Sequence, residues 1–537
     1  MKAVFNHLPA PAAALLLFAG LATPASAAKR SDVSPYLELD QVFIADLKGG
    51  SDDVLTYSSV AVGVDASVQT RRAEGQVNLR YEHHFSWNND LGDEDVVSGL
   101  ARGRVSIIGD ALSLEGGAIA TRARTDGLGG ANGTLIGDNI GEIYSAYAGP
   151  TLATHVGELS VNAAYRLGYS RVDSDTDVTT PTGVQTLGGY DDSVYHSAQV
   201  AVGMQPGERP FGWSVGAGYD REDAGQLDQR YEGKHVRADV TVPVSGHVAL
   251  VGGIGYEDIE ISQRDVLLDA GGNPVVDSKG RFVTDKSAPR ELTYDQDGLI
   301  WDAGVMWRPS RRTSLEVHVG RRYGSMTYTG MFSYQPNGRT SLQVAAYDGI
   351  SSFGRQINDN LASLPTSFTI ASNPFSGDFA GCAFGTQGGG VCFNDVLQAI
   401  SAANFRHRGI AAQLSSRSGR WDYGVALGYS RRKFIAPDTG IFAGVNGKLD
   451  ENYSANLFAA RRLDEKSGVD VQLYANYFDS AVLGTIDVYN MGAYAGYYRN
   501  FTDRLRGTAA LGIDSVDADG FESTVSALAQ LGLRYQF

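Results

Sequence analysis

The chain has 537 residues, of which 43% are hydrophobic and only 20% are charged, with 66 Gly, 27 Tyr and 21 Phe. Its formal net charge of −16 disfavours a nucleic-acid partner. After the first residues, no stretch approaches the ~18 consecutive apolar residues that a membrane helix needs, so any insertion into a membrane must use strands.

The first 27 residues are predicted to be a secretory signal. Lys2 gives a short basic start, residues 12–22 form an apolar run, and Ala25-Ser26-Ala27 is a small-residue cleavage site. No cysteine follows this site, so a lipid anchor is not expected. Cleavage after Ala27 leaves residues 28–537, which show no linker or shift in composition and are predicted to form one domain.

Segments of about ten residues with alternating apolar and polar side chains recur along the mature chain. Val77, Leu79 and Tyr81, for example, lie on one face of one segment. Short connections alternate with longer acidic ones such as residues 173–192 and 264–297. The pattern predicts an all-β fold, a transmembrane antiparallel up-and-down β-barrel of about 22 strands, within a range of about 18 to about 26. We expect the short turns and both termini to be periplasmic and the long loops to be outside.

The longest connection, residues 351–404, is predicted to be an extracellular loop that contains the only two cysteines. Cys382 and Cys392 enclose a glycine-rich stretch, and an oxidising periplasm favours a disulfide between them. A metal pair is the weaker interpretation, because the loop has no histidine to complete a site. Asn394 can cap a short helix beyond the bridge. Such a loop could fold into the lumen and narrow it, or cover the barrel from outside.

The last residues alternate in the same way, with Leu531, Leu533, Tyr535 and Phe537 on one face. A terminal strand of this kind that ends in phenylalanine resembles the signal read by the barrel-assembly machinery, so we take Tyr535 and Phe537 as the insertion signal. The expected location is the outer membrane. Lipid and lipopolysaccharide would surround the barrel there.

The faces opposite the apolar ones should line the lumen, and they are rich in arginine. The candidate lumen residues are Arg80, Arg102, Arg104, Arg166, Arg322, Arg432, Arg506 and Arg534, with Glu38, Asp40, Glu82 and Glu316 of opposite sign. One hypothesis is an arginine track that favours anionic or polyhydroxylated solutes. The other is that these residues only solvate the lumen and pair between strands.

The sequence shows none of the common catalytic motifs, and we expect no enzyme activity, no cofactor and no metal site. A barrel hydrolase with distant Ser and His partners is the least favoured alternative, since such partners can be far apart in the chain.

Three central motifs carry a family resemblance: residues 307–315 (WRPSRRTSL), 320–324 (GRRYG) and 347–349 (YDG). They resemble an uncharacterised family of β-barrel porins of Gram-negative outer membranes, and within it the outer-membrane proteins associated with exosortase and exopolysaccharide loci. The resemblance implies a barrel with an envelope role. We therefore expect a porin-like channel for solutes or polysaccharide, with a structural or accessory role in exopolysaccharide or protein export, beside an envelope partner, as the alternative.

Overall fold

A computed structural model gives the structure of the protein. It describes residues 30–49, 54–87, 93–125, 133, 135, 140–174, 189–207, 209–386, 389–398, 400–439, 442, 444–482 and 486–537. The predicted signal, residues 1–27, lies outside the described residues.

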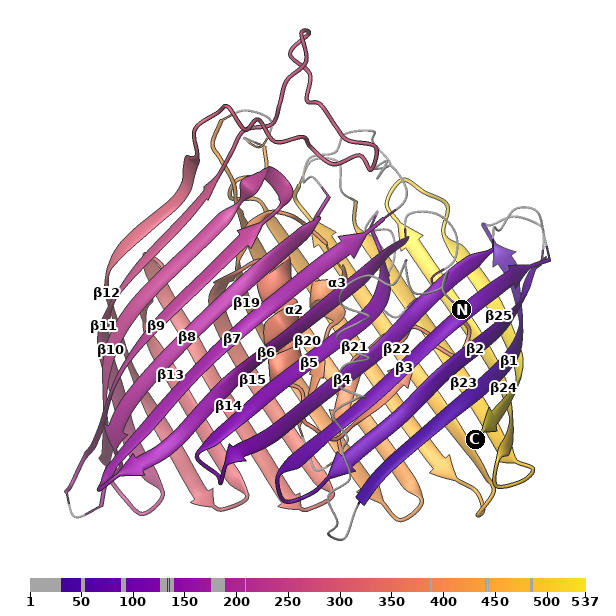
Figure 1. The fold of residues 1–537 in the computed structure, drawn as a ribbon, viewed down its shortest axis with the longest axis horizontal. Coiled ribbons are helices and arrows are strands. Elements are labelled where there is room, and N and C mark those ends of the chain that lie inside the picture. Colours follow the sequence, from indigo (N-terminus) through magenta and orange to yellow (C-terminus); the bar gives the residue numbers. More distant parts are fainter. Residues whose placement is uncertain are drawn as a thin grey trace.

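Twenty-two strands form one antiparallel sheet that closes on itself, because β1 pairs with both β2 and β25 (Figure 1). The first fifteen are β1 (Arg30–Lys48), β2 (Val54–Gln69), β3 (Ala73–Ser86), β4 (Glu94–Ile108), β5 (Leu112–Arg124), β6 (Ile140–Val156), β7 (Leu159–Asp173), β8 (Asp192–Met204), β9 (Gly212–Ala224), β10 (Arg230–Pro243), β11 (Val248–Gln263), β12 (Glu291–Ser310), β13 (Thr313–Arg322), β14 (Ser325–Asn337) and β15 (Thr340–Ser351). The last seven are β19 (Asn404–Ser418), β20 (Trp421–Ile435), β21 (Leu449–Arg462), β22 (Ser467–Ser480), β23 (Val488–Asn500), β24 (Leu505–Ala518) and β25 (Thr524–Gln536). The predicted all-β barrel of about 22 strands is confirmed.

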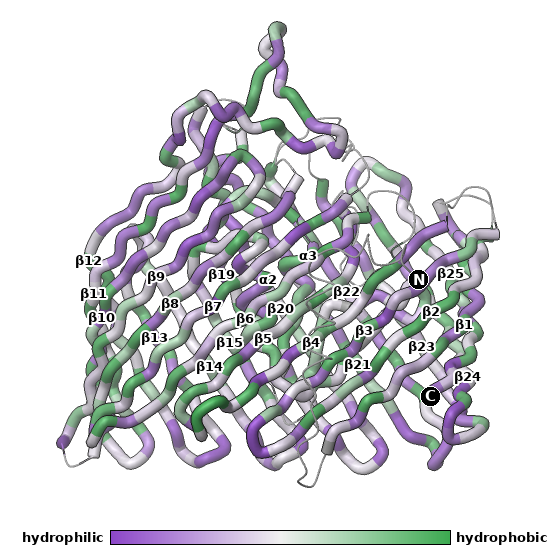
Figure 2. The backbone as a smooth tube through the Cα atoms, viewed as in Figure 1, coloured by the Kyte–Doolittle hydropathy of each residue, from purple (hydrophilic) through white to green (hydrophobic). Residues whose placement is uncertain are grey.

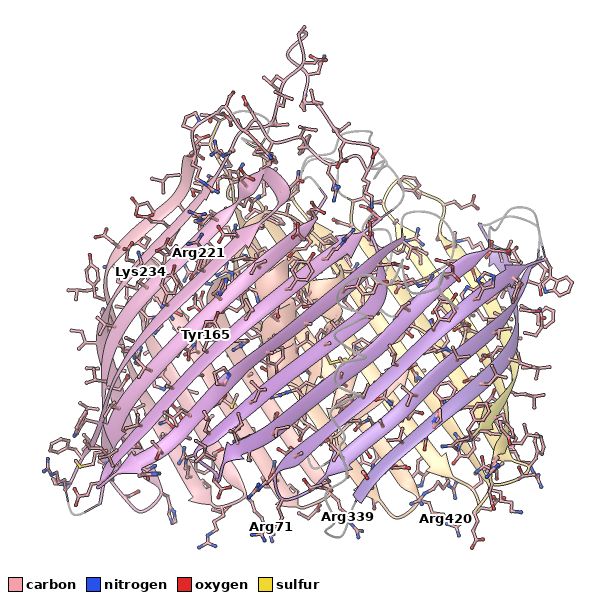
Figure 3. The ribbon with its side chains drawn as sticks, viewed as in Figure 1. Arg71, Tyr165, Arg221, Lys234, Arg339 and Arg420 are labelled. Carbon is pink, nitrogen blue, oxygen red and sulfur yellow. A yellow bond between two sulfur atoms is a disulfide. The ribbon has the colours of Figure 1, made fainter. Side chains whose placement is uncertain are left out.

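The two ends of the barrel differ. Tight turns join β2 to β3, β4 to β5 and the later hairpins at one end, which we call the turn end. Arg71, Arg339 and Arg420 lie there in Figure 3. Arg30 pairs with Gln69, so β1 begins at this end, and β25 finishes there. Most connections at the opposite, loop end are longer, although only Tyr323 and Gly324 join β13 to β14 there. The prediction of a loop over residues 264–297 is wrong in its extent, because β12 already begins at Glu291, where it pairs with Gln263 of β11.

Hydrophobic and hydrophilic residues alternate along the strands (Figure 2), and most of the exposed large apolar side chains in the strands have outward parity. In β25 the side chains of Leu531, Leu533, Tyr535 and Phe537 are exposed, whereas Leu528 is buried on the inner face. Four outward tyrosines on neighbouring strands β20–β23 stack in sequence, with ring centroids 4.9, 6.0 and 5.0 Å apart: Tyr429, Tyr453, Tyr477 and Tyr489. A closed barrel with an apolar wall and an aromatic girdle is the architecture of an outer-membrane protein, and this chain is one.

The connection between β15 and β19 folds inward and occupies part of the lumen. Its elements are α2 (Phe353–Ser363), β16 (Phe368–Ser372), β17 (Phe379–Gly385), β18 (Gly390–Cys392) and α3 (Asn394–Gln398), with β16, β17 and β18 forming a small sheet. We call residues 352–403, in their described part, the plug. Figure 1 shows α2 and α3 inside the ring of strands. Of the two arrangements that the sequence left open, the lumenal one is present, and the segment is not an outer cover.

Loops pack over the lumen at the loop end. The 3-10 helix η2 (Gln226–Asp228), residues 264–290 and residues 434–448 share an apolar cluster that includes Leu227, Phe282 and Phe442. Part of residues 264–290 forms the hairpin that protrudes at the top of Figure 1. Among the described residues, no helix has the length and apolar character to cross a membrane.

Candidate functional site

The plug has a continuous apolar core against the inner wall. Ser352 caps α2 by accepting a hydrogen bond from the backbone N–H of Arg355, and Phe353, Ile357 and Leu361 then recur every four residues on one face. This face and the buried plug residues Phe379, Phe393 and Val396 pack with Ile119, Ile143 and Tyr147 of β5 and β6. The predicted helix after the bridge is present as α3, whose Val396 and Leu397 are buried in the same cluster.

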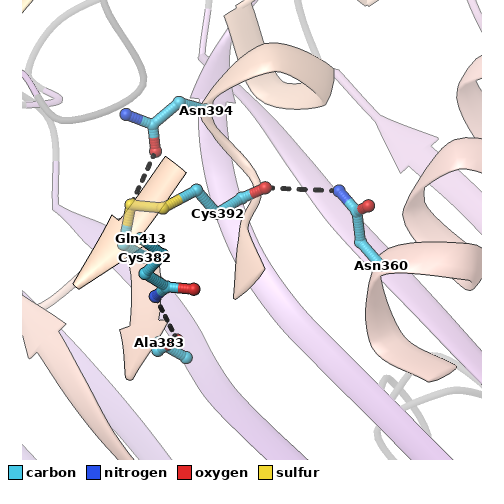
Figure 4. Close-up of a disulfide and its surroundings, with 6 residues drawn as sticks. All are labelled: Asn360, Cys382, Ala383, Cys392, Asn394 and Gln413. Carbon is cyan, nitrogen blue, oxygen red and sulfur yellow. Dashed lines mark hydrogen bonds between the residues drawn. A yellow bond between two sulfur atoms is a disulfide. The ribbon is translucent and has the colours of Figure 1, made fainter. Parts of the chain in front are cut away.

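A disulfide closes the plug between β17 and β18, as predicted: Cys382 is bonded to Cys392 (Figure 4). Two hydrogen bonds hold its neighbours. The side-chain amide of Asn360 donates to the Cys392 carbonyl at 3.4 Å, and that of Gln413 on β19 donates to the Ala383 carbonyl at 3.2 Å. The bridge therefore joins β17 to β18, Asn360 ties the small sheet to α2, and Gln413 ties the sheet to the wall.

Arg122 of β5 forms the most buried ion pair between wall and plug. Its Nε and Nη2 donate to the two carboxylate oxygens of Asp378 at 3.1 and 2.7 Å, and the two side chains are 1% and 4% exposed. Nη1 reaches Glu94 of β4 at 2.5 Å. A bidentate pair of this geometry fixes orientation as well as position.

The two helices of the plug are anchored by charge on opposite sides. Arg355 of α2 pairs with Glu222 of β9 at 3.1 Å and lies 3.6 Å from the ring centroid of Tyr231. Asp395 of α3 pairs with His407 at 2.7 Å and with Arg432 at 3.4 Å. Burial raises the pKa of Asp395, but Arg432 and His407 outweigh this effect and hold its pKa well below the usual range. Asp395 is therefore a charged anchor.

Three of the eight candidate lumen arginines contact the plug. Arg102 Nε donates to the Leu364 carbonyl at 3.1 Å, Arg166 pairs with Asp359 at 2.6 Å, and Arg432 pairs with Asp395 as above. With Arg122 and Arg355, these residues make the plug an anchored part of the barrel, since each charged group has a fixed partner.

A second group of candidate residues gathers near the turn end, below the plug. Arg80 pairs with Glu38 and Glu82 at 2.8 Å and with Asp40 at 3.3 Å. Arg506 and Arg534 lie over the rings of Tyr498 and Tyr36, at 4.7 and 3.5 Å from the centroids. A cavity of about 680 Å³ is lined by residues of this group, Glu38, Arg80, Arg506 and Arg534, and by plug residues.

Of the remaining candidates, Arg104 lies beside Arg102, which pairs with the same carboxylate, whereas Arg322 and Glu316 lie apart from both groups. Arg104 faces Glu115 on the neighbouring strand at 3.7 Å. Arg322 pairs with Glu257 at 2.6 Å on the far side of the lumen, and Glu316 on the same strand contacts His318 at 3.0 Å. The candidate arginines are thus divided among three places in the lumen.

The inner face of β10–β14 remains open to the lumen. Its polar side chains bond to one another: Arg237 pairs with Asp302 at 2.5 Å, and His318 contacts the same carboxylate at 2.8 Å. Glu316 is 44% exposed there, and even the apolar Met331, which shares a face with Glu316, is 61% exposed. A second cavity, of about 480 Å³, lies between the plug and β15, β19 and β20.

The sequence predictions missed several of these residues, namely Arg122, Glu222, Arg355, Asp378 and Asp395. Arg355 and Asp395 lie in α2 and α3, so predicting these helices would have pointed to them. The spacing of Phe353, Ile357 and Leu361 after Ser352 is a signal that could have identified α2. Within the described residues, no group of three His, Cys, Asp or Glu side chains is arranged to hold a metal ion.

No family model matches the sequence, and no curated protein matches it. Solved structures with a similar fold include the apoprotein form of the FrpB iron transporter from Neisseria meningitidis, at 10% identity over 94% of this chain and 81% of that chain, with a TM-score of 0.46. The ferric-catecholate import receptor Fiu from E. coli K12 is 12% identical over 93% of this chain and 81% of that chain, with a TM-score of 0.44. The siderophore receptor PiuA from Acinetobacter baumannii is 11% identical over 96% of this chain and 82% of that chain, also with a TM-score of 0.44. Likeness at this level carries no argument about what the present chain does.

Proposed function

We propose that the protein is a porin-like channel in which solutes cross the outer membrane beside the plug, along the inner face of β10–β14. One observation carries the proposal. Inward side chains under the plug are almost fully buried, as Arg122 is, whereas Glu316 and Met331 on the opposite wall are exposed inside the barrel. Exposure inside a closed barrel means contact with lumenal water.

The charges along this wall determine which solutes the passage favours. The inward groups of β10–β14 include four carboxylates and three guanidinium groups, namely Asp239, Glu257, Asp302 and Glu316 against Arg237, Arg308 and Arg322. A passage with this excess of carboxylate favours cations and neutral polyhydroxylated solutes over anions. The hypothesis of an arginine track for anions is therefore not carried into the proposal.

The finer assignment, to the porins associated with exosortase and exopolysaccharide loci, rests on the motifs at residues 307–349 alone. The alternative, an accessory role in export without an open channel, is favoured by a different observation. In the part of the plug that the structure describes, four ion pairs and the contact of His407 with Asp395 join the plug to the wall, which is more than a loose constriction requires. The two proposals differ in whether the purified protein conducts ions.

Planar-bilayer recording of the purified protein tests the proposal. We expect steady single-channel conductance and, in a gradient of potassium chloride, a reversal potential of the sign that marks cation preference. Glu316→Gln should reduce that preference, and Glu260→Gln, an exposed carboxylate on the outer face of β11, serves as the control. A protein that inserts as a folded barrel but conducts nothing would overturn the channel and favour the accessory role.

A further inference from the structure

The barrel wall is incomplete between β14 and β15 on the loop side. The two strands pair only from Gly330–Tyr334 against Leu342–Ala346 and at Asn337 with Thr340. Residues 325–329 of β14 pair with β13 alone, and residues 347–351 of β15 pair with β19 alone. We call these two unpaired segments the β14–β15 split. In lipid, a strand edge without its ladder needs other partners for its backbone groups.

Side chains from β19 supply these partners. Arg408 Nη2 donates to the Met326 carbonyl and to Ser325 Oγ, both at 3.1 Å. Arg406 Nη1 donates to Ser325 Oγ at 2.5 Å, and Asp348 of β15 holds both arginines, with Nε to carboxylate distances of 2.8 Å for Arg406 and 3.0 Å for Arg408. Guanidinium groups therefore bridge the split, whereas backbone hydrogen bonds join the other neighbouring strands.

The outer face of the split is both apolar and basic. Tyr328 and Met326 of β14 point outward and are 65% and 42% exposed. Arg321, which pairs in register with Met326 across β13 and β14, lies on the same outer face and is exposed. Among the described residues it forms no ion pair, and the side chain of Arg408 is 41% exposed. Two guanidinium groups thus flank Met326 at the top of an apolar strip.

The pairing of β4 with β5 also stops before the loop end of the two strands, but it does not share these features. The β4–β5 pairing stops at Gly99 and Ala120, but the arginine beyond it, Arg122, turns inward to the plug. An outward pair of arginines above an apolar strip is what distinguishes the β14–β15 split.

We propose that the β14–β15 split is a binding site for lipid A of the outer leaflet, with one acyl chain along Met326 and Tyr328 and a phosphate on Arg321 and Arg408. Planar guanidinium forks match phosphate oxygens, and the acyl chain covers the strand edge that lacks a neighbour. The site faces the membrane, so the proposal does not depend on whether the lumen conducts.

Photocrosslinking of the full-length protein tests the site. A photoreactive phenylalanine analogue replaces Tyr328 in one protein and Tyr453, an outward tyrosine of β21, in a control protein. Both are placed in phosphatidylcholine vesicles that contain either lipid A or phosphatidylglycerol. We expect the yield of the lipid A adduct at position 328 to exceed that at position 453 by at least about tenfold. Equal yields at the two positions would show only a general lipid shell and would overturn the proposal.

Arginine variants complete the test. In the protein labelled at position 328, Arg321→Ala with Arg408→Ala should reduce the lipid A yield to that of the control position. Arg461→Ala, which removes an outward arginine of β21 away from the split, should not. Retained heat-modifiable migration shows that each variant is folded, and the comparison of positions 328 and 453 needs no arginine variant. An equal yield with phosphatidylglycerol at position 328 would overturn the assignment to lipid A.

Discussion

Replacing Arg122 by alanine tests whether the plug is held as the contacts suggest. The change removes three hydrogen bonds and leaves the Asp378 carboxylate, 4% exposed in its side chain, without a cation. Glu94 also loses its contact with Arg122, but His84 remains 3.7 Å away and the Glu94 side chain is 41% exposed. The cost of the variant therefore arises mainly at Asp378.

An uncompensated buried charge costs about 3 to 5 kcal/mol. If the plug responds by detaching from the barrel wall, this free energy corresponds to an increase of roughly two to four powers of ten in the population of the detached plug. The barrel itself should persist, because its ladders do not involve this pair. Water entering the space of the lost guanidinium would bring the effect to the lower end of that range.

Hydrogen exchange of the amides of α2 and β17 measures this directly, since exchange from the plug follows its opening equilibrium. Adding Asp378→Asn to Arg122→Ala removes the orphaned charge and should restore much of the protection. Arg71→Ala at the turn end is the control and should leave the plug unchanged. Unaltered exchange in Arg122→Ala, or a double variant worse than the single one, would refute the reasoning.

Three further predictions concern the bridge, the last strand and acid. Reduction or Cys382→Ser removes a bridge spanning 10 positions and worth about 3 kcal/mol, so plug amides should exchange faster while heat-modifiable migration is retained; loss of the barrel would contradict this. Deletion of Phe537 removes an outward aromatic that packs on Tyr535 with ring centroids 5.2 Å apart, so the amount of assembled barrel in outer-membrane fractions should fall, and an undiminished amount would count against the insertion signal. The depressed pKa of Asp395 contributes stability above the unfolded pKa of about 4 and loses it only as the pH falls through the lower folded value. Protection of α3 should therefore be constant between about pH 7 and about pH 5, and a loss within that interval would exclude this anchor.

The barrel was predictable because its determinants are local. An alternation with a period of two residues decides which side chains meet lipid, and turn residues decide where strands end, so strand number and the outward face of β25 follow from the sequence. The bridge was predictable for a similar reason, since two cysteines ten positions apart have no competing partner in the chain. That Tyr535 and Phe537 act as an assembly signal stays a prediction.

The plug shows where alternation stops being informative. Arg122 has the same parity as Leu114, whose side chain is exposed on the outer surface, so alternation places it on the lipid side. It reaches the plug because β5 leaves β4 after Ala120. The contacts of Arg102 and Arg166 with the plug could not be predicted either. Both have inward parity, and only the three-dimensional path of residues 352–403 brings Leu364 and Asp359 to them.

Access of a water-soluble reagent to Met331 tests the central claim, an aqueous passage beside an anchored plug, most directly. Met331→Cys and Ser145→Cys place single thiols on inward faces that are 61% exposed and 0% exposed, and the native cysteines are bonded to each other. During planar-bilayer recording, a charged thiosulfonate reagent should lower the conductance of Met331→Cys in a single step and leave Ser145→Cys unchanged. Conductance that persists unchanged while mass spectrometry shows modification of position 331, or the absence of any conductance, would contradict the account.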